Sequence, residues 1–250
     1  MTERLAVVTG GNKGIGRSCA ARLLTEGYRV IVTGRDQEAL DGTVAELEGS
    51  GGIEARRFDV TDEEAVAEAF ADLDVDVLVA NAGVAFSQPL ERTDLDDWRW
   101  VLDVNVTGVF LCARAVIAGM RERDHGRVIA VASVASHHGL RYGTAYAASK
   151  HGVLGFIRAL ATEVAGSGVT ANAVCPAFVD TPMTDRSVAN IAEKTGRSEE
   201  ESRRALERMS PLDRLVTPEE VAAAVAYLAS DAAAPVNGQS IILDGGGVQQ

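Results

Sequence analysis

A tyrosine and a lysine stand four residues apart in the stretch AYAASKHGVLGF, as Tyr146 and Lys150. Positions i and i+4 lie on the same face of a helix, so a helix over this stretch would point both polar groups the same way. A free tyrosine has a pKa of about 10, and a neighbouring ammonium lowers that pKa by stabilising the ionised phenol. Such a phenol can exchange a proton with a carbonyl or alcohol oxygen near neutral pH. The alternative is a half-buried tyrosine ring beside a solvated lysine.

Two more polar residues stand in apolar surroundings. Ser133 ends an apolar run thirteen residues before Tyr146, at the carboxyl end of an expected strand, where α/β proteins bind ligands. Its hydroxyl can polarise a substrate oxygen, although Ser136 is a close competitor and strand-end serines without a function are common. Asn105 lies inside an expected helix, where asparagine is a poor helix former. It is either a functional residue or a buried amide whose hydrogen bonds are satisfied.

A glycine-rich segment, TGGNKGIG from Thr9 to Gly16, separates a strand-length apolar run from a helix-length stretch. Gly10 permits a tight turn, and Gly14 and Gly16 allow the backbone to approach a pyrophosphate closely. The anion would lie at the N-terminus of the next helix, where unpaired N–H groups and the helix dipole attract it. The segment therefore predicts a dinucleotide site. Its contacts from this segment are expected to be Gly10, Asn12, Lys13, Gly14, Ile15 and Gly16.

Strand-length apolar runs alternate with helix-length amphipathic stretches along the chain. The expected strands cover residues 5–9, 28–33, 53–58, 75–81, 127–133, 169–175 and 240–244. The expected helices cover residues 14–26, 37–48, 62–71, 95–121, 145–165 and 217–229. Most of the strands are β-branched and apolar throughout, which is typical of strands covered on both faces. The alternation predicts an α/β fold, namely a Rossmann-like, doubly wound, parallel seven-stranded sheet with helices on both faces, in one domain over residues 1–250.

The segment 180–210 interrupts this alternation, because it is strongly charged and helical in pattern. It follows the carboxyl end of the sixth expected strand, and insertions at such a point lie over the ligand crevice. We therefore predict a substrate lid, and the alternative is a solvated pair of surface helices. Three of its cations, Arg203, Arg204 and Arg208, could meet an acidic carrier protein or a CoA phosphate, although charged helix faces are usually only solvated.

Composition excludes several classes of protein. The formal net charge of −12 argues against a partner that is nucleic acid or anionic lipid. The three cysteines form no CxxC pair, and the adjacent His137 and His138 lack suitably spaced partners, so we expect no metal site. The longest uninterrupted apolar stretch is 221–229, which is too short to span a membrane, and the N-terminal run is typical of a strand rather than a signal peptide. We expect a cytoplasmic protein.

Five motifs occur in a definite order: TGGNKGIG, NAG at 81–83, Asn105 in NVTG, Ser133, and Tyr146-x-x-x-Lys150. Together they resemble the short-chain dehydrogenase/reductase family, in its single-domain branch of about this length. The resemblance extends over nearly the whole chain, as far as LDGG near the end. The phrase NAVCPAFVDTPM and the long charged segment before Pro211 are similar to acyl-type ketoreductases of polyketide and fatty-acid metabolism.

The resemblance implies a nicotinamide cofactor, and the end of the second strand, VTGRDQ, bears on its type. In this family the acid that binds a bare ribose falls on the position of Gly34, and NADP-dependent members carry arginine at the position of Arg35. Lys13 would add a second positive charge beside the 2′-phosphate. Asp36 is the competing signal, since it lies about where a ribose-binding acid is sought, but it is also well placed as a helix N-cap. We favour NADP(H) and keep NAD(H) open.

The resemblance also assigns further residues to the cofactor and the reaction. Asp59 would meet the adenine, and the NAG segment would pass under the adenosine ribose. Val179 and Thr181 would bind the nicotinamide carboxamide, and Asn105 would bend its helix and hold a water that relays protons to Lys150. The additional cofactor contacts implied in this way are Asp59, Val60, Asn81, Ala82, Gly83, Tyr146, Lys150, Pro176, Val179 and Thr181. The catalytic set implied is Ser133, Tyr146, Lys150 and Asn105.

The activity implied is hydride transfer between NADP(H) and a ketone or secondary alcohol, with a 3-oxoacyl- or polyketide-type carbonyl, free or linked to a carrier protein or CoA. One alternative is an NAD-dependent alcohol or hydroxy-acid dehydrogenase. Another is a dinucleotide-sensing protein without catalysis, although such proteins tend to lose the tyrosine–lysine pair. A serine hydrolase is disfavoured because the chain has no G-x-S-x-G segment. The family is often tetrameric, so we expect a homotetramer with the helices 95–121 and 145–165 in one interface.

Overall fold

The computed structural model describes residues 4–249, and its centre is a seven-stranded parallel sheet in the order β3-β2-β1-β4-β5-β6-β7. The strands are β1 (Leu5–Thr9), β2 (Arg29–Gly34), β3 (Ile53–Arg57), β4 (Val77–Ala80), β5 (Gly126–Val131), β6 (Val169–Pro176) and β7 (Ser240–Leu243). Strands β1, β4, β5 and β6 are buried along their whole length, as their β-branched, apolar sequences predict. The predicted doubly wound sheet is confirmed, and each strand end falls within two residues of its expected position.

The strand order changes direction at β1, which pairs with β2 on one side and with β4 on the other. Val7 of β1, for example, stands opposite Ile31 of β2 and Leu78 of β4. In a doubly wound sheet, ligands bind beyond the carboxyl ends of the strands at such a change of order. The glycine-rich turn follows β1 directly, and the NAG segment follows β4, so both lie at this point.

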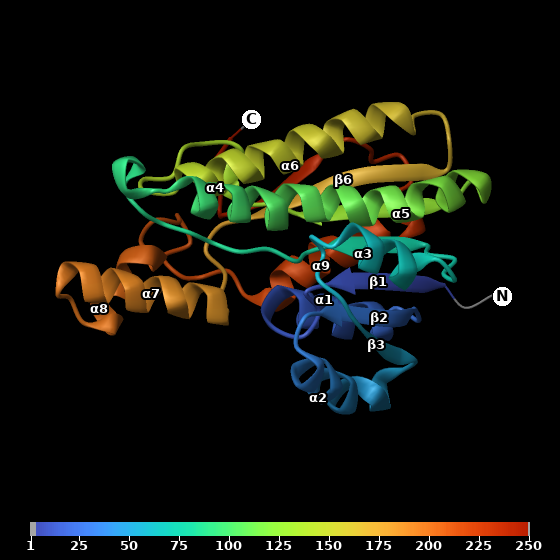
Figure 1. Ribbon diagram of the computed structural model, residues 1–250, viewed down its shortest axis with the longest axis horizontal. Coiled ribbons are helices and arrows are strands. Elements are labelled where there is room, and N and C mark those ends of the chain that lie inside the picture. Colours follow the sequence, from blue (N-terminus) through green and yellow to red (C-terminus); the bar gives the residue numbers. More distant parts are fainter. Residues whose placement is uncertain (1–3, 250) are drawn as a thin grey trace.

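Helices cover both faces of the sheet (Figure 1). On one face lie α1 (Gly14–Thr25), α2 (Gln37–Leu47) and α9 (Pro218–Ala229), and on the other lie α3 (Glu63–Phe70), α5 (Gly108–Glu122) and α6 (Thr144–Glu163). Because successive strand residues point to opposite faces, Ala6 and Val8 pack against the first layer, whereas Leu5 and Val7 pack against the second. Two apolar cores therefore hold the sheet, and the cysteines, Cys19, Cys112 and Cys175, are free thiols buried in them.

One long helical stretch contains an irregular turn. Helix α4 (Leu95–Leu102) passes through a π-helical turn over Asp103–Thr107 into α5. Within residues 4–249, Leu95–Glu122 is the one helix long and apolar enough to cross a membrane by length and composition, with a mean hydropathy of 1.7. Half of its apolar window is buried, and Leu111, Val116 and Met120 belong to the core beside the sheet, so it packs here as a core helix. Our expectation considered only uninterrupted apolar runs and did not identify this stretch.

The charged segment after β6 folds into α7 (Pro182–Thr195) and α8 (Glu199–Glu207), which lie together at one end of the molecule, away from the body of the sheet (Figure 1). The side chain of Thr181 caps α7, with proline at its first position, and α8 begins with a capping box between Ser198 and Glu201. Gly196, in the left-handed region at φ 71°, ends α7 and allows the chain to reverse. We refer to residues 182–207 as the α7–α8 pair.

Candidate active site

Tyr146 and Lys150 lie in the first two turns of α6, at the carboxyl end of β5. The Lys150 Nζ donates a 2.9 Å hydrogen bond to the carbonyl oxygen of Val131, the last residue of β5. The same Nζ lies 5.7 Å from the centroid of the Tyr146 ring. Lys150 is 6% exposed and Tyr146 is half-buried. The helix therefore brings the two side chains together on its inner face, as their spacing predicts.

The pKa of Tyr146 corrects one part of the sequence-based prediction. Burial raises the pKa of Tyr146 above its ordinary value, and a hydrogen bond with the Ser133 side chain acts in the opposite direction without reversing the shift. The prediction that Lys150 lowers this pKa is therefore wrong for the polypeptide itself. The physical reason is geometric, because the lysine nitrogen lies beside the ring and gives its hydrogen bond to Val131.

Lys150 is itself strongly perturbed. Burial lowers the pKa of Lys150 from its ordinary value to about 8, because the charged ammonium loses much of its hydration. A lysine with such a pKa gains and loses a proton close to neutral pH, which an exposed lysine does not. The pair thus consists of a phenol that keeps its proton at neutral pH and an amine that can exchange one.

Ser133 follows β5 in an extended conformation and caps a short 3₁₀ turn, Val134–Ser136. Its Oγ accepts a 3.1 Å hydrogen bond from the Ala135 N–H, and the Ser133 side chain lies close enough to the Tyr146 hydroxyl to oppose the rise of its pKa that burial causes. The competing Ser136 is buried, and its side chain acts on the Cys175 thiol instead. The turn therefore directs Ser133, rather than Ser136, to the tyrosine.

Asn105 occupies the middle of the π-helical turn and is 1% exposed. Its Nδ2 donates to the Val84 carbonyl at 3.0 Å and to the Ser149 hydroxyl at 2.9 Å, and its Oδ1 accepts from the Val84 N–H at 2.8 Å. Ser149 in turn donates to the Tyr146 carbonyl at 2.7 Å. The amide thus joins the segment after β4 to α6 beside the tyrosine–lysine pair. π turns often occur at functional sites, and the irregular helix agrees with the predicted bend.

The glycine-rich turn is fastened to the NAG segment by one hydroxyl. Thr9 Oγ1 accepts hydrogen bonds from the N–H groups of Asn81 and Ala82, each at 3.0 Å. The Asn81 side chain donates to the carbonyl oxygens of Thr9 at 2.9 Å and of Gly10 at 3.2 Å. A Cβ at Gly16 would lie 2.3 Å from the Gly10 carbonyl oxygen, so no side chain fits there. Four hydrogen bonds thus join the glycine-rich turn (9–16) to the NAG segment (81–83) at the centre of the sheet, and we call the two joined segments the floor of the site.

Helix α1 begins at this floor with its N–H groups open. Its N-cap residue, Lys13, makes no side-chain capping hydrogen bond, and its first turn contains no acidic residue. Unpaired N–H groups at a helix N-terminus bind phosphate. Gly14, at φ 51°, comes so close to Thr181 that a Cβ would lie 3.1 Å from the threonine Cγ2. The residues present therefore fit a dinucleotide, and Thr181, far away in sequence, is beside the predicted pyrophosphate site.

The distal end of this site carries the residues that bear on cofactor type. A cleft of about 520 Å³ is lined on one side by Arg35 and Asp59 and on another by Trp100 and Val104. Arg35 is 67% exposed in its side chain and reaches Asp59 only at 3.5 Å. Asp36 accepts a 3.1 Å hydrogen bond from the Ala39 N–H and caps α2. The acid is therefore engaged in its helix, whereas the arginine is available at the mouth of the cleft.

The Asp59 carboxylate is held by Thr61 as well as by Arg35. Its Oδ1 accepts from the Thr61 N–H at 3.0 Å and from the Thr61 hydroxyl at 2.8 Å. Burial opposes ionisation, but these hydrogen bonds and Arg35 outweigh it, and the pKa of Asp59 is lowered. Val60 follows it and packs in the core against Gly108, where a Cβ would meet the Val60 side chain at 2.7 Å. The carboxylate is thus fixed in its ionised form at the entrance to the cleft.

The loops that follow β4 and β5 touch each other. The Gln88 N–H donates to the Tyr142 carbonyl at 2.7 Å, and Arg141 stacks over the Tyr142 ring at 4.8 Å. Lys194 of α7 donates to the Ser87 carbonyl at 3.3 Å. The loops 84–92 and 137–143 and the α7–α8 pair therefore meet at one place. Among residues 4–249 no group of three or more His, Cys, Asp or Glu side chains is arranged to hold a metal ion.

Of the predicted site residues, Ser133, Tyr146, Lys150 and Asn105 converge around the first turns of α6, and Gly10, Gly14, Gly16, Asn81, Ala82, Gly83 and Thr181 surround the start of α1. Sequence reasoning did not identify three residues that hold this arrangement: Thr9, Val131 and Ser149. Ser149 could have been found, because it lies three residues after Tyr146 on the same helix face. The Val131 carbonyl could not, since every residue carries one.

Comparisons with known proteins agree with this site. A family model described as enoyl-(acyl carrier protein) reductase matches residues 10–247. A Streptomyces virginiae protein, provisionally named a ketoacyl reductase of the monensin polyketide synthase, is 41% identical over 98% of this chain and 97% of its own. The 3β-hydroxysteroid dehydrogenase of Mediterraneibacter gnavus is 37% identical over 98% of this chain and 94% of its own.

A solved structure gives the same result at the level of the fold. A tryptophan variant of actinorhodin polyketide ketoreductase, crystallised with NADPH, superposes with a TM-score of 0.94 at 37% identity and covers 98% of this chain and 97% of that one. The sheet order, the glycine-rich turn and the Ser133–Tyr146–Lys150 set are thus accompanied by full-length similarity to oxidoreductases acting on CH–OH and C=O groups. The chain belongs to the short-chain dehydrogenase/reductase family.

Proposed function

We propose that this protein reduces a ketone to a secondary alcohol with NADPH, and that the ketone is a 3-oxoacyl- or polyketide-type carbonyl. The observation that carries the proposal is the convergence of Ser133, Tyr146 and buried Lys150 beside a floor built for a dinucleotide. The names of the similar ketoacyl reductase and of the polyketide ketoreductase solved with NADPH support the same substrate class and cofactor.

The three side chains have distinct tasks in this reaction. Bound NADPH supplies the hydride for the carbonyl carbon. Ser133 donates a hydrogen bond to the carbonyl oxygen and orients it, and Tyr146 gives its proton to the same oxygen as negative charge develops there. The raised pKa keeps Tyr146 protonated at neutral pH, which is the form that a reduction needs. Lys150 holds positive charge beside the phenol and returns a proton to it after each turnover.

Asn105 holds the segments on either side of the proton-transfer residues in place. It fixes Val84 and Ser149, and a Cβ placed on Gly83 would lie 3.2 Å from the Asn105 Oδ1 and 3.8 Å from the Lys150 Nζ. The asparagine is therefore close to the amine of Lys150. Its side chain bonds to Val84 and Ser149, and we propose in addition that Asn105 helps to hold a water that relays protons to Lys150.

The cofactor choice rests on Arg35 and Asp36. Arg35 is exposed at the end of β2 and binds Asp59 weakly, so its guanidinium can take a 2′-phosphate, and Lys13 is exposed in the neighbouring turn. Asp36, the acid that would prefer a bare ribose, caps α2. The proposed contacts of the remaining predicted residues, from Asp59 and Val60 at the adenine to Pro176, Val179 and Thr181 at the nicotinamide, follow the course of the cofactor from this end to Tyr146.

Cofactor kinetics test this choice. We expect the wild type to use NADPH in preference to NADH, and Arg35→Met to lower that preference about 10- to 100-fold, because it removes a charge-assisted hydrogen bond. Arg29→Met is the matched control, since Arg29 lies at the opposite end of β2 in an exposed ion pair with Glu54. The ratio of kcat/KM values for the two cofactors is the measurement, and a wild type that prefers NADH contradicts the assignment.

The substrate class is tested with a panel of ketones. We propose that the α7–α8 pair is a lid over the entrance formed by loops 84–92 and 137–143, because Lys194 already links α7 to Ser87. The panel contains 3-oxoacyl thioesters of CoA and of a carrier protein, simple 3-oxoesters, and 3-keto steroids. The steroid arm is included because a similar protein is a 3β-hydroxysteroid dehydrogenase. A kcat/KM that is highest for the steroids would replace the acyl assignment.

We further propose a homotetramer in the cytoplasm, with α5 and α6 in one interface. Three large apolar side chains, Leu95, Trp100 and Phe110, are exposed on the long helical stretch, and Phe110 packs edge-to-face against Phe156 of α6 at 6.3 Å. Exposed apolar groups on adjacent helices are typical of a subunit contact. Light scattering should give four times the chain mass, and Phe110→Glu should lower it.

A further inference from the structure

The α7–α8 pair has a core of its own. Val188 of α7, Leu206 of α8 and Leu215 form a small buried cluster, with Phe178 and Ile191 packed against it. This cluster is separate from the two cores that hold the sheet. The pair can therefore keep its internal structure while its position relative to the sheet is set by other contacts.

The connection between the α7–α8 pair and the sheet is short, and we call it the base: it consists of residues 178–180 before the pair and Val216 after it. The segments that enter and leave the pair lie side by side, because Val179 and Val216 form a parallel bridge. The Val216 N–H donates to the Phe178 carbonyl and the Asp180 N–H donates to the Val216 carbonyl, each at 2.9 Å. Two short, neighbouring segments thus form the connection, and such segments can absorb a hinge motion.

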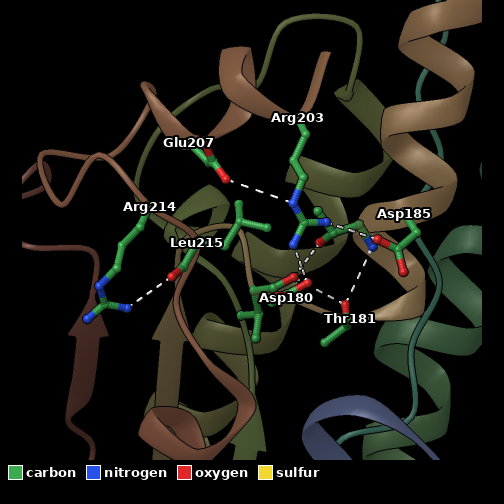
Figure 2. Close-up of polar contacts among 9 residues, drawn as sticks. Asp180, Thr181, Asp185, Arg203, Glu207, Arg214 and Leu215 are labelled. Carbon is green, nitrogen blue, oxygen red and sulfur yellow. Dashed lines mark hydrogen bonds and ion pairs between the residues drawn. The ribbon is translucent and has the colours of Figure 1, made fainter. Parts of the chain in front are cut away.

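One guanidinium ties α8 to this base. Arg203 donates through Nη2 to the Asp180 carboxylate at 2.5 Å and through Nη1 to that of Asp185 at 3.2 Å, and its Nε lies 3.8 Å from the Glu207 carboxylate (Figure 2). The three acids belong to the base, to α7 and to α8. Arg204, the neighbouring cation, binds Glu207 in its own helix at 3.0 Å, and within residues 4–249 no second ion pair is found for it. Arg203 is therefore not free for an external anion, a possibility that the sequence alone left open.

Asp180 connects this network to the cofactor site. It immediately precedes Thr181, which caps α7 and lies against Gly14 at the start of α1. The chain position of Asp180 thus fixes where Thr181 stands relative to the predicted pyrophosphate and nicotinamide sites. A shift of α8 that breaks the contact between Arg203 and Asp180 would remove one of the contacts that hold the segment next to the cofactor site.

We propose that Arg203 is a positioning residue, which couples closure of the α7–α8 pair to seating of the nicotinamide half of the cofactor by holding Asp180 and, through it, Thr181. The inference rests on the proposed contact between Thr181 and the nicotinamide carboxamide. It assigns Arg203 no contact with substrate. The ion pairs are partly exposed, with Asp180 and Asp185 side chains 54% and 60% exposed, so the contact can open and close.

A comparison of two ligands isolates the contribution of the nicotinamide half of the cofactor to binding. NADPH and 2′-phospho-ADP-ribose share the adenosine, 2′-phosphate and pyrophosphate, and only NADPH carries nicotinamide. Calorimetry gives the dissociation constant of 2′-phospho-ADP-ribose divided by that of NADPH for the wild type, Arg203→Met, Asp180→Asn and the control Arg204→Met. We expect the ratio to fall about 5- to 10-fold in the first two variants through weaker NADPH binding alone, and to stay at the wild-type value in Arg204→Met. In Arg203→Lys the ratio should lie between those of Arg203→Met and the wild type, because lysine keeps the positive charge but lacks the planar guanidinium group that binds two carboxylates.

These binding measurements test the proposal for Arg203 without any measurement of catalytic activity. A wild-type ratio in both Arg203→Met and Asp180→Asn overturns it, as does an equal weakening of both ligands or a wild type that binds the two ligands equally. If Arg203→Met fails to fold, the ratio in Asp180→Asn, which keeps the shape of its side chain, decides by itself. If no ketone is reduced, the proposed function fails, whereas the ratio of the two ligands still tests Arg203.

Discussion

The catalytic centre and the α7–α8 pair are held together by different forces. Lys150 and Asn105 are buried and bonded to backbone groups of the large core, at Val131 and Val84. The α7–α8 pair has a small core and is tied to its base through Arg203 and partly exposed carboxylates. Buried hydrogen bonds fix geometry, whereas exposed ion pairs are weak and screened by salt. The proposed chemistry therefore lies in the part held by buried hydrogen bonds, and the α7–α8 pair, which we propose as the lid, is held by weaker contacts.

The largest effect should come from the catalytic centre. Tyr146→Phe removes the proton donor and leaves the ring in place, so we expect kcat to fall about 10²- to 10⁴-fold. NADPH affinity, measured by fluorescence titration, should change little. Tyr227→Phe is the control, because Tyr227 is exposed on α9, and it should keep wild-type kcat. Turnover by Tyr146→Phe close to that of the wild type would show that another group gives the proton.

The rigid floor under the cofactor should tolerate no side chain. In Gly16→Ala the new Cβ would lie 2.3 Å from the Gly10 carbonyl oxygen, so the turn must shift, and we expect NADPH affinity to fall by about tenfold or more. Gly42→Ala is the matched control, because no atom lies within 4 Å of a Cβ on that helical glycine, and it should be neutral or stabilising by up to ~1 kcal/mol. Equal affinity for NADPH in the two variants would mean that the cofactor does not lie on this turn.

The pH dependence of ketone reduction should follow the protonation of the buried Lys150 amine. Lys150 is charged below its pKa of about 8 and loses its proton as the pH rises through that value, whereas Tyr146, with its raised pKa, stays protonated. We therefore expect kcat/KM for NADPH in ketone reduction to be level below about pH 8 and to fall about tenfold per pH unit above it. Lys150→Arg keeps its charge over this range and should show no such fall. A wild-type profile that is level up to pH 10 contradicts a role for the charge of Lys150.

The smallest effect on the whole molecule should come from the core of the α7–α8 pair. Leu206→Ala should raise hydrogen exchange over residues 182–207 and change the global free energy of unfolding by less than ~1 kcal/mol, because that small cluster is separate from the sheet cores. Leu228→Ala, in the core beside α1, should instead lower the global free energy by about 2–5 kcal/mol. Equal global losses would show that the two regions unfold as one unit.

The elements and the fold could be predicted because they depend on local patterns. Strand ends fell within two residues, since β-branched apolar runs such as LAVVT are bounded by charged or glycine residues. The tyrosine–lysine contact could be predicted for the same reason, because four-residue spacing fixes it within one helix. Asp36 could be recognised as an alternative N-cap from its place before α2, and the structure confirms that role.

What could not be predicted depends on contacts between distant segments. The direction of the Tyr146 pKa shift follows from burial by the surrounding fold, which its four-residue spacing from Lys150 does not reveal. Two of the three partners of Arg203 lie 18 and 23 residues away, so the sequence alone left open whether Arg203 is solvated or meets an external anion. The Thr9 hydroxyl, which binds the segment after β4, is one more threonine in a strand until the sheet order is known.

The most direct test of the central claim is a crystal structure with NADP⁺ and the alcohol product. The account predicts the Tyr146 hydroxyl about 2.6–3.2 Å from the alcohol oxygen, and the carbon that bears this oxygen about 3–3.5 Å from C4 of the nicotinamide. Ser133 should bind the same oxygen. An alcohol held by other groups, with the Tyr146 hydroxyl out of hydrogen-bond reach of it, would contradict the assignment of Tyr146 as the proton donor.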